Sequence, residues 1–389
     1  MTYMEDLNVI ELTQALMRCP SVTPNDAGAL NVLQSVLEKI GFECSRLTFS
    51  DDNTPDVDNL YARIGTGAPN FCFAGHTDVV PPGDLNAWSV DPFDSVIKDG
   101  MLYGRGAADM KAAVACFAVA SQRHLKKYHG NYKGSISLLI TGDEEGPAIN
   151  GTRKVLEWMT SNGEHIDHCL VGEPTNPNAL GEMFKIGRRG SFTGFLTVSG
   201  NEGHIAYPHL ADNPIPHLVA MMSALDGMHL DDGSDHFQPS NLEFTTVDVG
   251  NLATNVTPAL ARATFNIRFN TIHSLDGLDE KIRTLLDDVA SKRGANYELR
   301  VLKNSEPFLT GEGDFSKLVG RSIEQHLGRA PEMSTTGGTS DARYIKNYCP
   351  VVEFGLVGQT MHKVDERVDL ADIESLANIY TTILDGYFT

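Results

Sequence analysis

Residues 70–78 read Asn-Phe-Cys-Phe-Ala-Gly-His-Thr-Asp, an apolar run that ends in a polar turn. Such a run is typical of a strand that is buried on both faces, as in a parallel sheet covered by helices. Residues 135–141, Ser-Ile-Ser-Leu-Leu-Ile-Thr, repeat the pattern, and residues 168–171 form a shorter apolar run. The three runs therefore predict the centre of an α/β sheet.

Helical patterns alternate with these strands in the first half of the chain. Apolar residues recur at helical spacing over residues 7–17 and 29–40, and small apolar residues dominate residues 110–123. Residues 152–159 form a further predicted helix. This alternation predicts an α/β fold with helices on both faces of the sheet.

The pattern changes near residue 189. Residues 192–199 alternate like a half-exposed strand, residues 242–249 and 261–269 are further predicted strands, and residues 214–225 and 275–291 are helical. About a hundred residues of this texture are typical of one inserted α+β domain. The prediction is a catalytic domain in two segments, 1–188 and 301–389, interrupted by an inserted domain at 189–300.

Composition limits the classes of partner. At 389 residues the chain is too long for one ordinary core, which favours two domains. The net charge of −20 argues against nucleic acid and anionic membranes as partners, because no basic field would attract a polyanion. An anionic substrate would therefore need cationic side chains within the site itself.

Several features favour a cytoplasmic location. The six cysteines show no Cys-x-x-Cys pairing and lie largely within apolar runs, which favours reduced, buried thiols. Residues 1–12 are acidic and amphipathic, without the basic and apolar regions of a secretory leader. No apolar stretch approaches the roughly 20 residues that a membrane span needs.

Acidic residues and one histidine follow the ends of three predicted strands. His76 follows the first strand, Glu144 and Glu145 follow the second, and Glu173 follows the third. In open α/β sheets, ligands collect beyond the carboxyl ends of the strands. Adjacent like charges such as Glu144 and Glu145 need compensation, which nearby cations would supply. A solvated acidic loop is the alternative for this pair.

Two more residues complete a candidate metal set. Asp109 follows a glycine-rich turn, where its carboxylate could bridge two cations or simply cap a helix. His362, near the C-terminus, could be a ligand or an ordinary surface histidine. Two histidines, three ligand carboxylates and one spare carboxylate are what two zinc ions and a general base need.

Four stretches carry a resemblance to a known family. They are Phe-Ala-Gly-His-Thr-Asp-Val-Val-Pro-Pro-Gly at 73–83, Tyr-Gly-Arg-Gly with Asp-Met-Lys within 103–111, Asp-Glu-Glu-Gly at 143–146 and Gly-Glu-Pro-Thr at 172–175. In this order they resemble the metal motifs of the co-catalytic zinc aminoacylase and peptidase group, which includes acetylornithine deacetylase. The resemblance implies a zinc-peptidase-like catalytic domain with a central mixed sheet, and an inserted lid and dimerisation domain.

The resemblance also implies a role for each member of the set. Asp109 would bridge two Zn²⁺ ions, for which Co²⁺ is an expected substitute. His76 and Glu173 would complete one metal site. Glu145 and His362 would complete the other.

Two carboxylates would act in catalysis by the same resemblance. Asp78 would support His76, since an oriented imidazole is the better ligand. Glu144 would be the general acid and base. The resemblance further implies a cis peptide bond between Asp109 and Met110.

Residues 185–191, 203–209 and 337–343 resemble one branch of the group, the desuccinylases that act on N-succinyl-LL-2,6-diaminopimelate. That substrate carries carboxylates at both ends, and arginine is well suited to bind them. Arg343 is a further candidate clamp, although at least one basic residue is expected to pair with an acidic neighbour instead. The substrate-binding residues implied are Lys185, Arg188, Ser191, His204, Tyr207, Asn255, Arg268, Gly338 and Thr339.

Two of these residues imply a homodimer. By the resemblance, His204 of one subunit stabilises the oxyanion in the site of its partner, and Asn255 resembles a second contact of this kind. The chain departs from many relatives in the stretch Gly358-Gln359-Thr360, which lacks the asparagine that they carry there, shortly before the histidine ligand. This departure weakens the case for a substrate contact at Gly358.

The expected reaction is hydrolysis of the succinyl amide to succinate and LL-2,6-diaminopimelate, in lysine and cell-wall precursor biosynthesis. Deacetylation of acetylornithine and dipeptide hydrolysis are the alternatives within the same group. A non-catalytic metal-binding scaffold is the alternative from another class. Glu144 argues against a scaffold, because no metal needs it as a ligand.

Overall fold

The computed structural model describes residues 6–389 and divides into two compact units. The first unit comprises the chain up to Ile186 together with Thr310–Ser334 and Ser340–Thr389, and the second comprises Gly187–Leu309 and Thr335–Thr339. The expectation for the N-terminus falls partly on residues 1–5, which lie outside the described residues. None of the helices in residues 6–389 is long and apolar enough to cross a membrane.

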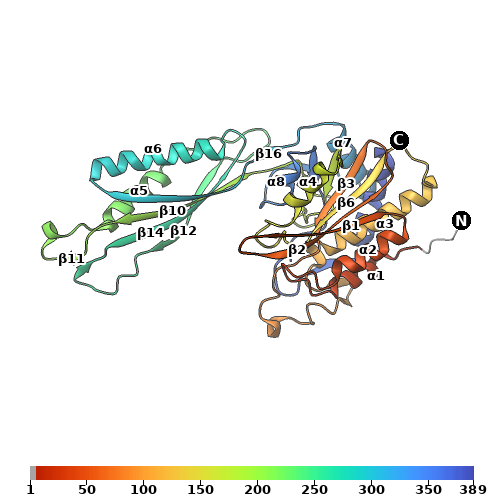
Figure 1. Ribbon diagram of the computed structural model, residues 1–389, viewed down its shortest axis with the longest axis horizontal. Coiled ribbons are helices and arrows are strands. Elements are labelled where there is room, and N and C mark those ends of the chain that lie inside the picture. The colour runs from red at the N-terminus through yellow and green to blue at the C-terminus, as the bar shows by residue number, and fades with distance from the viewer. Residues whose placement is uncertain (1–5) are drawn as a thin grey trace. The chain divides into compact units, whose positions relative to one another are not determined.

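The first unit is built on an eight-stranded mixed sheet (Figure 1). The neighbours β6, β3, β7 and β18 run parallel, whereas β1, β2 and β6 pair antiparallel at one edge, and β8 lies antiparallel to β18 and parallel to β17 at the other. This arrangement confirms the predicted α/β class with a central mixed sheet. In spatial order the strands are β1 (Glu43–Asp51), β2 (Thr54–Ile64), β6 (Ser135–Thr141), β3 (Asn70–His76), β7 (His168–Val171), β18 (Val351–Glu353), β8 (Met183–Lys185) and β17 (Glu332–Ser334).

Helices cover both faces of this sheet. The larger apolar core lies between the sheet and α1, α2, α3, α7 and α9, whereas α4 packs against β2, β6 and α8. Phe71 and Phe73 of β3 both stack on Phe117 of α3, with ring centroids 6.0 and 4.4 Å apart. The helices are α1 (Val9–Met17), α2 (Ala29–Lys39), α3 (Ala112–Tyr128), α4 (Thr152–Ser161), α7 (Asp314–Leu327), α8 (Ala342–Ile345) and α9 (Leu370–Tyr387).

A smaller sheet and two short helical turns complete the first unit. The turn η2 (Ala107–Lys111) leads directly into α3, and η1 (Leu85–Ala87) lies in the loop after β3. The small sheet joins β19 (Arg367–Asp369), β5 (Met101–Tyr103) and β4 (Val96–Lys98) in antiparallel order. It therefore joins the loop before Asp109 to the segment after His362.

The second unit is an antiparallel four-stranded sheet with two helices (Figure 1). Leu218 of α5 and Ile282 of α6 are fully buried against the sheet. Strand β15 pairs with β10 along its length and passes through residue 300 as part of this sheet. The sheet order is β12 (Asn241–Asp248), β14 (Leu260–Phe269), β10 (Gly190–Ser199) and β15 (Asn296–Ser305), with α5 (Pro214–Asp226) and α6 (Leu275–Arg293).

Short elements border the second unit. Strands β9 (Gly187–Arg188) and β16 (Phe308–Leu309) pair where the chain enters and leaves it. Strands β11 (Gly203–His204) and β13 (Val256–Thr257) pair antiparallel, and the turn η3 (Pro208–Leu210) follows β11. All six cysteines lie within the described residues and are free thiols.

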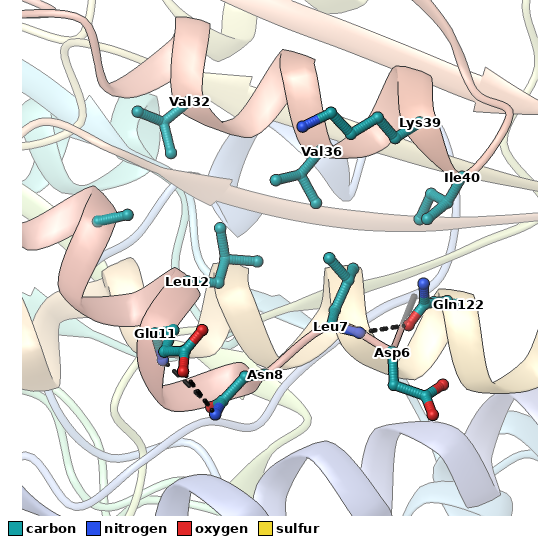
Figure 2. Close-up of a pocket in the computed structure, with 11 residues that line it drawn as sticks. Asp6, Leu7, Asn8, Glu11, Leu12, Val32, Val36, Lys39, Ile40 and Gln122 are labelled. Atoms are coloured by element: carbon teal, nitrogen blue, oxygen red, sulfur yellow. Dashed lines mark hydrogen bonds between the residues drawn. The ribbon is translucent and has the colours of Figure 1, made fainter. Parts of the chain in front are cut away.

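One cavity of about 560 Å³ lies between α1, α2 and Gln122 of α3. Figure 2 shows Leu12, Val32 and Val36 facing one another across it, and the amide of Leu7 donating to Gln122 Oε1 over 2.9 Å. Its wall is mostly apolar, and it contains none of the predicted metal ligands or substrate contacts. The candidate site therefore has to be sought at the ends of the strands.

Candidate metal centre

Three parallel strands deliver acidic and imidazole side chains to one edge of the central sheet. His76 is the last residue of β3, which pairs in register with β6 and β7. Glu144 and Glu145 follow β6, and Glu173 follows β7. Because the strands are parallel, their carboxyl ends meet, and the side chains converge as expected for a site at this edge.

Asp109 reaches the same place from the turn η2. Gly106, which begins this turn, has φ of 83°, and a Cβ there would lie 2.9 Å from Val79 Cγ1. Glycine is therefore required both for the backbone conformation and for the close approach. The peptide bond between Asp109 and Met110 is cis, as the sequence resemblance implied.

His362 enters from the loop that precedes β19. Its φ is 60°, a left-handed conformation that residues other than glycine seldom adopt. The side chain is about half exposed, with a fractional exposure of 48%. Residues held in such conformations are common at functional sites.

Asp109 lies between the two imidazoles. Its Oδ1 is 3.2 Å from His76 Nε2, and its Oδ2 is 3.2 Å from His362 Nε2. On the first side Glu173 Oε1 lies 3.9 Å from His76 Nε2. On the second side Glu145 Oε1 lies 2.8 Å from His362 Nε2. The five side chains thus form two donor groups that share one carboxylate.

The donor set fits two divalent cations. Donor atoms of His76, Asp109 and Glu145 lie within 4.8 Å of one another, as do those of His76, Glu144 and Glu173. The first group combines ligands expected at both ions, and the second includes Glu144, the expected base. Zinc holds nitrogen and oxygen ligands at about 2.0–2.2 Å, so two ligands of one ion lie within roughly 4.4 Å of each other. Glu173 Oε1 is buried and has no hydrogen-bond partner among the described residues, as expected of an acceptor that faces a cation.

The surrounding carboxylates raise the pKa of both imidazoles in the metal-free protein. Burial disfavours the charged form of His76, but neighbouring carboxylates, chiefly Asp109, raise its pKa well above the usual value. Hydrogen bonds to Asp109 and Glu145 raise the pKa of His362 to about 10. Burial opposes ionisation of Asp109, yet the two imidazoles hold its pKa below the usual value. Cations at the site would therefore displace protons.

Glu144 lies beside the ligands with an unusual proton affinity. Burial raises the pKa of Glu144 well above its ordinary value, and the carboxylates of Asp341 and Glu145 add to the effect although His76 opposes it. A carboxylate whose pKa is raised binds a proton more readily and is suited to general acid and base catalysis. Asp341 belongs to the stretch 337–343 quoted above, but no pattern in the sequence indicates that it lies near Glu144.

Asp78 contacts both His76 and the backbone of the two adjacent glutamates. His76 Nδ1 lies 2.9 Å from the backbone oxygen of Asp78, whereas the Asp78 carboxylate lies at 3.5 Å. That carboxylate accepts hydrogen bonds from the backbone N–H groups of Glu144 at 3.3 Å and Glu145 at 3.0 Å. Asp78 therefore fixes the backbone of both glutamates as well as facing His76.

Two of the predicted basic substrate contacts are buried. Lys185, in the first unit, has its Nζ 3.3 Å from Ser334 Oγ. Arg188, in the second unit, donates from Nη1 to the backbone oxygens of Gly338 at 3.0 Å and Thr336 at 3.4 Å. Their exposed fractions are 5% and 7%. Buried cations of this kind are suited to meeting an anionic group.

The remaining predicted contacts of the second unit form two groups. Ser191 and Arg268 are cross-strand partners, and Thr339 Oγ1 is buried without a hydrogen-bond partner among the described residues. His204 and Tyr207 are exposed, with ring centroids 5.8 Å apart. The structure places Asn255 next to them, because the amide of Ile205 donates to its backbone oxygen at 3.1 Å.

Arg343 is paired with acidic neighbours. Its Nη2 lies 3.8 Å from Asp341 Oδ1, and its guanidinium lies 4.7 Å from the ring centroid of Tyr344. Arg343 is thus a basic residue of the kind expected to have an acidic partner within the protein.

Comparison with known proteins agrees with this architecture. The chain is 58% identical over 379 residues to the succinyl-diaminopimelate desuccinylase of Parvibaculum lavamentivorans, covering 97% of this chain and 95% of the relative. It is 59% identical over 379 residues to the enzyme of the same name from Rhodospirillum centenum, covering 97% of each.

Solved structures with much lower identity share the fold. The M20 family metallo-carboxypeptidase Sso-CP2 from Sulfolobus solfataricus superposes with a TM-score of 0.78 at 18% identity, covering 98% of this chain and 99% of the other. Aminopeptidase PepT from Bacillus cereus gives 0.77 at 20% identity, covering 97% of each. Residues 72–386, which include all the candidate ligands, match Peptidase family M20/M25/M40. The chain is therefore a member of peptidase family M20/M25/M40.

Proposed function

We propose that this chain is a dinuclear zinc amidohydrolase that cleaves N-succinyl-LL-2,6-diaminopimelate to succinate and LL-2,6-diaminopimelate, a step of lysine and cell-wall precursor biosynthesis. The observation that carries the proposal is Asp109, whose two oxygens each face one imidazole, with Glu144 beside them. The names of relatives at 58% and 59% identity support the choice of substrate.

Five side chains would hold the metal pair. Asp109 would bridge, with His76 and Glu173 on one side and Glu145 and His362 on the other. Two Zn²⁺ ions, or Co²⁺ in their place, would lower the pKa of the attacking water and polarise the amide carbonyl.

Glu144 would move the proton. It would accept a proton from the water as the water attacks the succinyl carbonyl, and return that proton to the leaving amine as the C–N bond breaks. The hydrogen bonds from the backbone of Glu144 and Glu145 to Asp78 support this role, because they fix the backbone from which the Glu144 side chain extends. The products are then a carboxylic acid and a free amine.

Cationic side chains would bind the substrate carboxylates. Lys185, Arg188 and Arg268 are proposed as the clamps, with Ser191, Gly338 and Thr339 as neutral contacts. The unpartnered hydroxyl of Thr339 supports this assignment, because it could donate a hydrogen bond to a substrate oxygen. Local cations of this kind would offset the unfavourable net charge of −20.

The second unit would serve as lid and dimerisation domain. We propose that His204, Tyr207 and Asn255 complete the site of a partner subunit, which requires a homodimer. Their exposure and mutual contacts support a role outside the unit's own core. A cytoplasmic location is proposed as well, supported by the six free cysteines, which are typical of a reducing compartment.

A comparison of rates would test the choice of substrate. The purified, zinc-loaded protein would be assayed with N-succinyl-LL-2,6-diaminopimelate, N-acetylornithine and a simple dipeptide. The proposal expects the highest kcat/KM for the succinyl substrate. A higher value for either alternative would transfer the assignment to another activity of the family, and hydrolysis of none would favour a metal-binding scaffold.

Mixing two inactive variants would test the shared site. In a heterodimer of Glu144→Gln and His204→Ala subunits, the site that lacks neither residue exists only if His204 acts on the partner subunit. After random exchange of subunits, about a quarter of the wild-type activity should return. A mixture that stays inactive would show that His204 acts within its own subunit.

A further inference from the structure

Arg105 and Glu366 form a fully buried ion pair beside the candidate metal centre. Arg105 precedes the turn that carries Asp109, and Glu366 follows His362 in the chain. The two side chains are 2% and 0% exposed, and Arg105 Nη1 lies 2.6 Å from Glu366 Oε2. Burial of two charges is unfavourable unless each has good partners, so the other contacts of the pair indicate its role.

Glu366 holds the backbone of the bridging residue. Its second oxygen, Oε1, accepts hydrogen bonds from the N–H groups of Ala108 at 2.9 Å and Asp109 at 3.2 Å. The backbone oxygen of Glu366 accepts a third, from Gly104 at 2.8 Å. One residue near the C-terminus therefore fixes the whole glycine-rich turn on which the position of the Asp109 carboxylate depends.

Arg105 connects the segments of the two histidines. Its Nη1 also donates to the backbone oxygen of Lys363 at 3.2 Å, the residue after His362. Its Nη2 donates to the backbone oxygen of Pro81 at 3.4 Å, in the loop that follows His76. A planar guanidinium with several donors is able to hold three segments at once, whereas a lysine ammonium is a compact point charge.

Further contacts join the loop after β3 to the segment after His362. The Arg105 guanidinium lies 5.2 Å from the ring centroid of Trp88, and Trp88 Nε1 donates to the backbone oxygen of Pro82 at 2.9 Å. The amide of Ser89 donates to Asp365 Oδ1 at 2.8 Å. The loop after β3 and the segment after His362 are therefore joined at several points around Arg105.

We infer that Arg105 and Glu366 are positioning residues of the metal centre, which hold the segments of His76, Asp109 and His362 in the spacing that two cations require. The inference rests on the proposed metal pair. Ligands fixed by a surrounding shell bind metal more tightly than loose ones, because less order is lost on binding.

The charges of the pair agree with this role. Each cancels the other, so the pair adds rigidity without adding to the negative charge of the ligand set. An unpaired Glu366 would be another buried carboxylate next to Asp109 and would attract the cations away from their ligands. An unpaired Arg105 would instead compete with the cations for Asp109.

Zinc titration of two variants would test the inference. Glu366→Gln keeps the size of the side chain but replaces one carboxylate oxygen by an NH₂ group. That group faces either Arg105 or the backbone N–H groups of Ala108 and Asp109, which are all donors, so the hydrogen bonds on that side are lost. Arg105→Lys keeps the charge and loses the three-way contact. Zinc affinity, measured on folded, metal-free protein by competition with a chromophoric chelator, should fall about 10- to 100-fold in each variant.

Arg63 and Glu164 supply the matched control. They form an ion pair on β2 and beyond α4, at the end of β6 remote from the site, with side chains 20% and 25% exposed. Glu164→Gln and Arg63→Lys should lower the melting temperature of the metal-free protein while leaving zinc affinity unchanged. Excess zinc should restore part of the activity of Glu366→Gln, which would not occur for a misfolded chain.

Two outcomes would overturn the inference. Zinc affinity in Glu366→Gln and Arg105→Lys equal to that of the wild type and of the control variants would show that the pair only stabilises the fold. A wild-type chain that binds no zinc would overturn the proposed function together with the inference. Because metal binding is measured without turnover, failure of the substrate assignment alone would leave the inference standing.

Discussion

Asp109 owes its central place to a carboxylate whose two oxygens face in opposite directions. Each oxygen lies 3.2 Å from one imidazole nitrogen, so the same residue belongs to both donor groups. Glu144, next to Glu145 in the chain, is held by Asp78 through its backbone and keeps its carboxylate available. The proposed roles of ligand and base therefore fall on adjacent residues, of which Glu145 directs Oε1 to His362 Nε2 at 2.8 Å.

Glu144→Gln is expected to separate metal binding from catalysis. The variant should retain two zinc ions per chain, while kcat falls about 10²- to 10⁴-fold because the proton acceptor is lost. Initial rates of succinate release and metal content by elemental analysis would be measured together. Glu145→Gln is the control, since it should lose metal as well as activity. Turnover of Glu144→Gln at the wild-type rate would refute the assignment of the base.

Uptake of zinc is expected to release protons. The pKa of His76 is raised well above its usual value and that of His362 is raised to about 10, so both imidazoles carry a proton at pH 7 in the metal-free protein. An imidazole that binds a metal ion must be neutral, so each imidazole gives up one proton and zinc affinity rises with pH. Calorimetry in two buffers of different ionisation enthalpy would measure the release. Heats that do not depend on the buffer would contradict it.

At the scale of the elements, parallel strands gather the site. The ends of β3, β6 and β7 place His76 and the following glutamates together because the three strands are in register. The apolar runs predicted these strands closely: β6 and β7 have the predicted bounds, and β3 occupies Asn70–His76 of the stretch 70–78. A strand that is apolar at every position is stable only where both of its faces are buried, as in the middle of a sheet covered by helices.

Other elements could not be predicted in the same way. Residues 43–51 form β1, but each of them is at least partly exposed, so their sequence shows no continuous apolar run that would mark a buried strand. The helix predicted over 110–123 begins at Ala112, because Asp109 and Met110 have non-helical backbone angles within η2. The placement of His362 depends on contacts between distant segments, which composition and periodicity do not contain.

Loops in the second unit depend on buried hydrogen bonds. The carboxylate of Asp231, between α5 and β12, accepts from the amide of Gly233 at 2.8 Å, from Asn270 Nδ2 at 2.6 Å and from His273 Nε2 at 3.0 Å. Burial alone would raise the pKa of Asp231, but hydrogen bonds, led by those from Ser240 and Gly233, lower it to about 2. The ionised form therefore stabilises the fold.

Asp231→Asn is expected to destabilise the protein in a pH-dependent way. Because the folded-state pKa of about 2 lies below the ordinary value of 3.8, the stabilisation is complete above about pH 5 and decreases as the pH falls from 4 towards 2. At pH 7 the variant should lose about 1–3 kcal/mol in the free energy of unfolding. Urea unfolding of both proteins between pH 3 and 8 would measure the difference. A difference that grows as the pH falls would contradict the assignment.

At the scale of the whole molecule, one unit carries the ligands and the other carries most of the proposed substrate contacts. The ligands lie in the first unit, whereas Arg188, Arg268 and His204 lie in the second. Under the proposed function, substrate specificity and metal binding would therefore be encoded in separate parts of the chain.

Long-range contacts limit what the sequence alone reveals about the site. The convergence of His76, Glu144, Glu145 and Glu173 could be predicted because these residues end or follow strands of one sheet. The pairing of Arg105 with Glu366 joins positions 261 residues apart, and no motif relates them. The contacts proposed for a partner subunit are even harder to predict from sequence, since His204 and Asn255 would act on a chain other than their own.

Succinate release as a function of added zinc tests the central claim most directly. Metal-free protein would be prepared with a chelator, titrated with zinc, and assayed with N-succinyl-LL-2,6-diaminopimelate. The account predicts no release without metal and a rate that reaches its plateau at about two zinc ions per chain, one for each donor group around Asp109. Release that persists in the metal-free protein, or none at any zinc concentration, would contradict it.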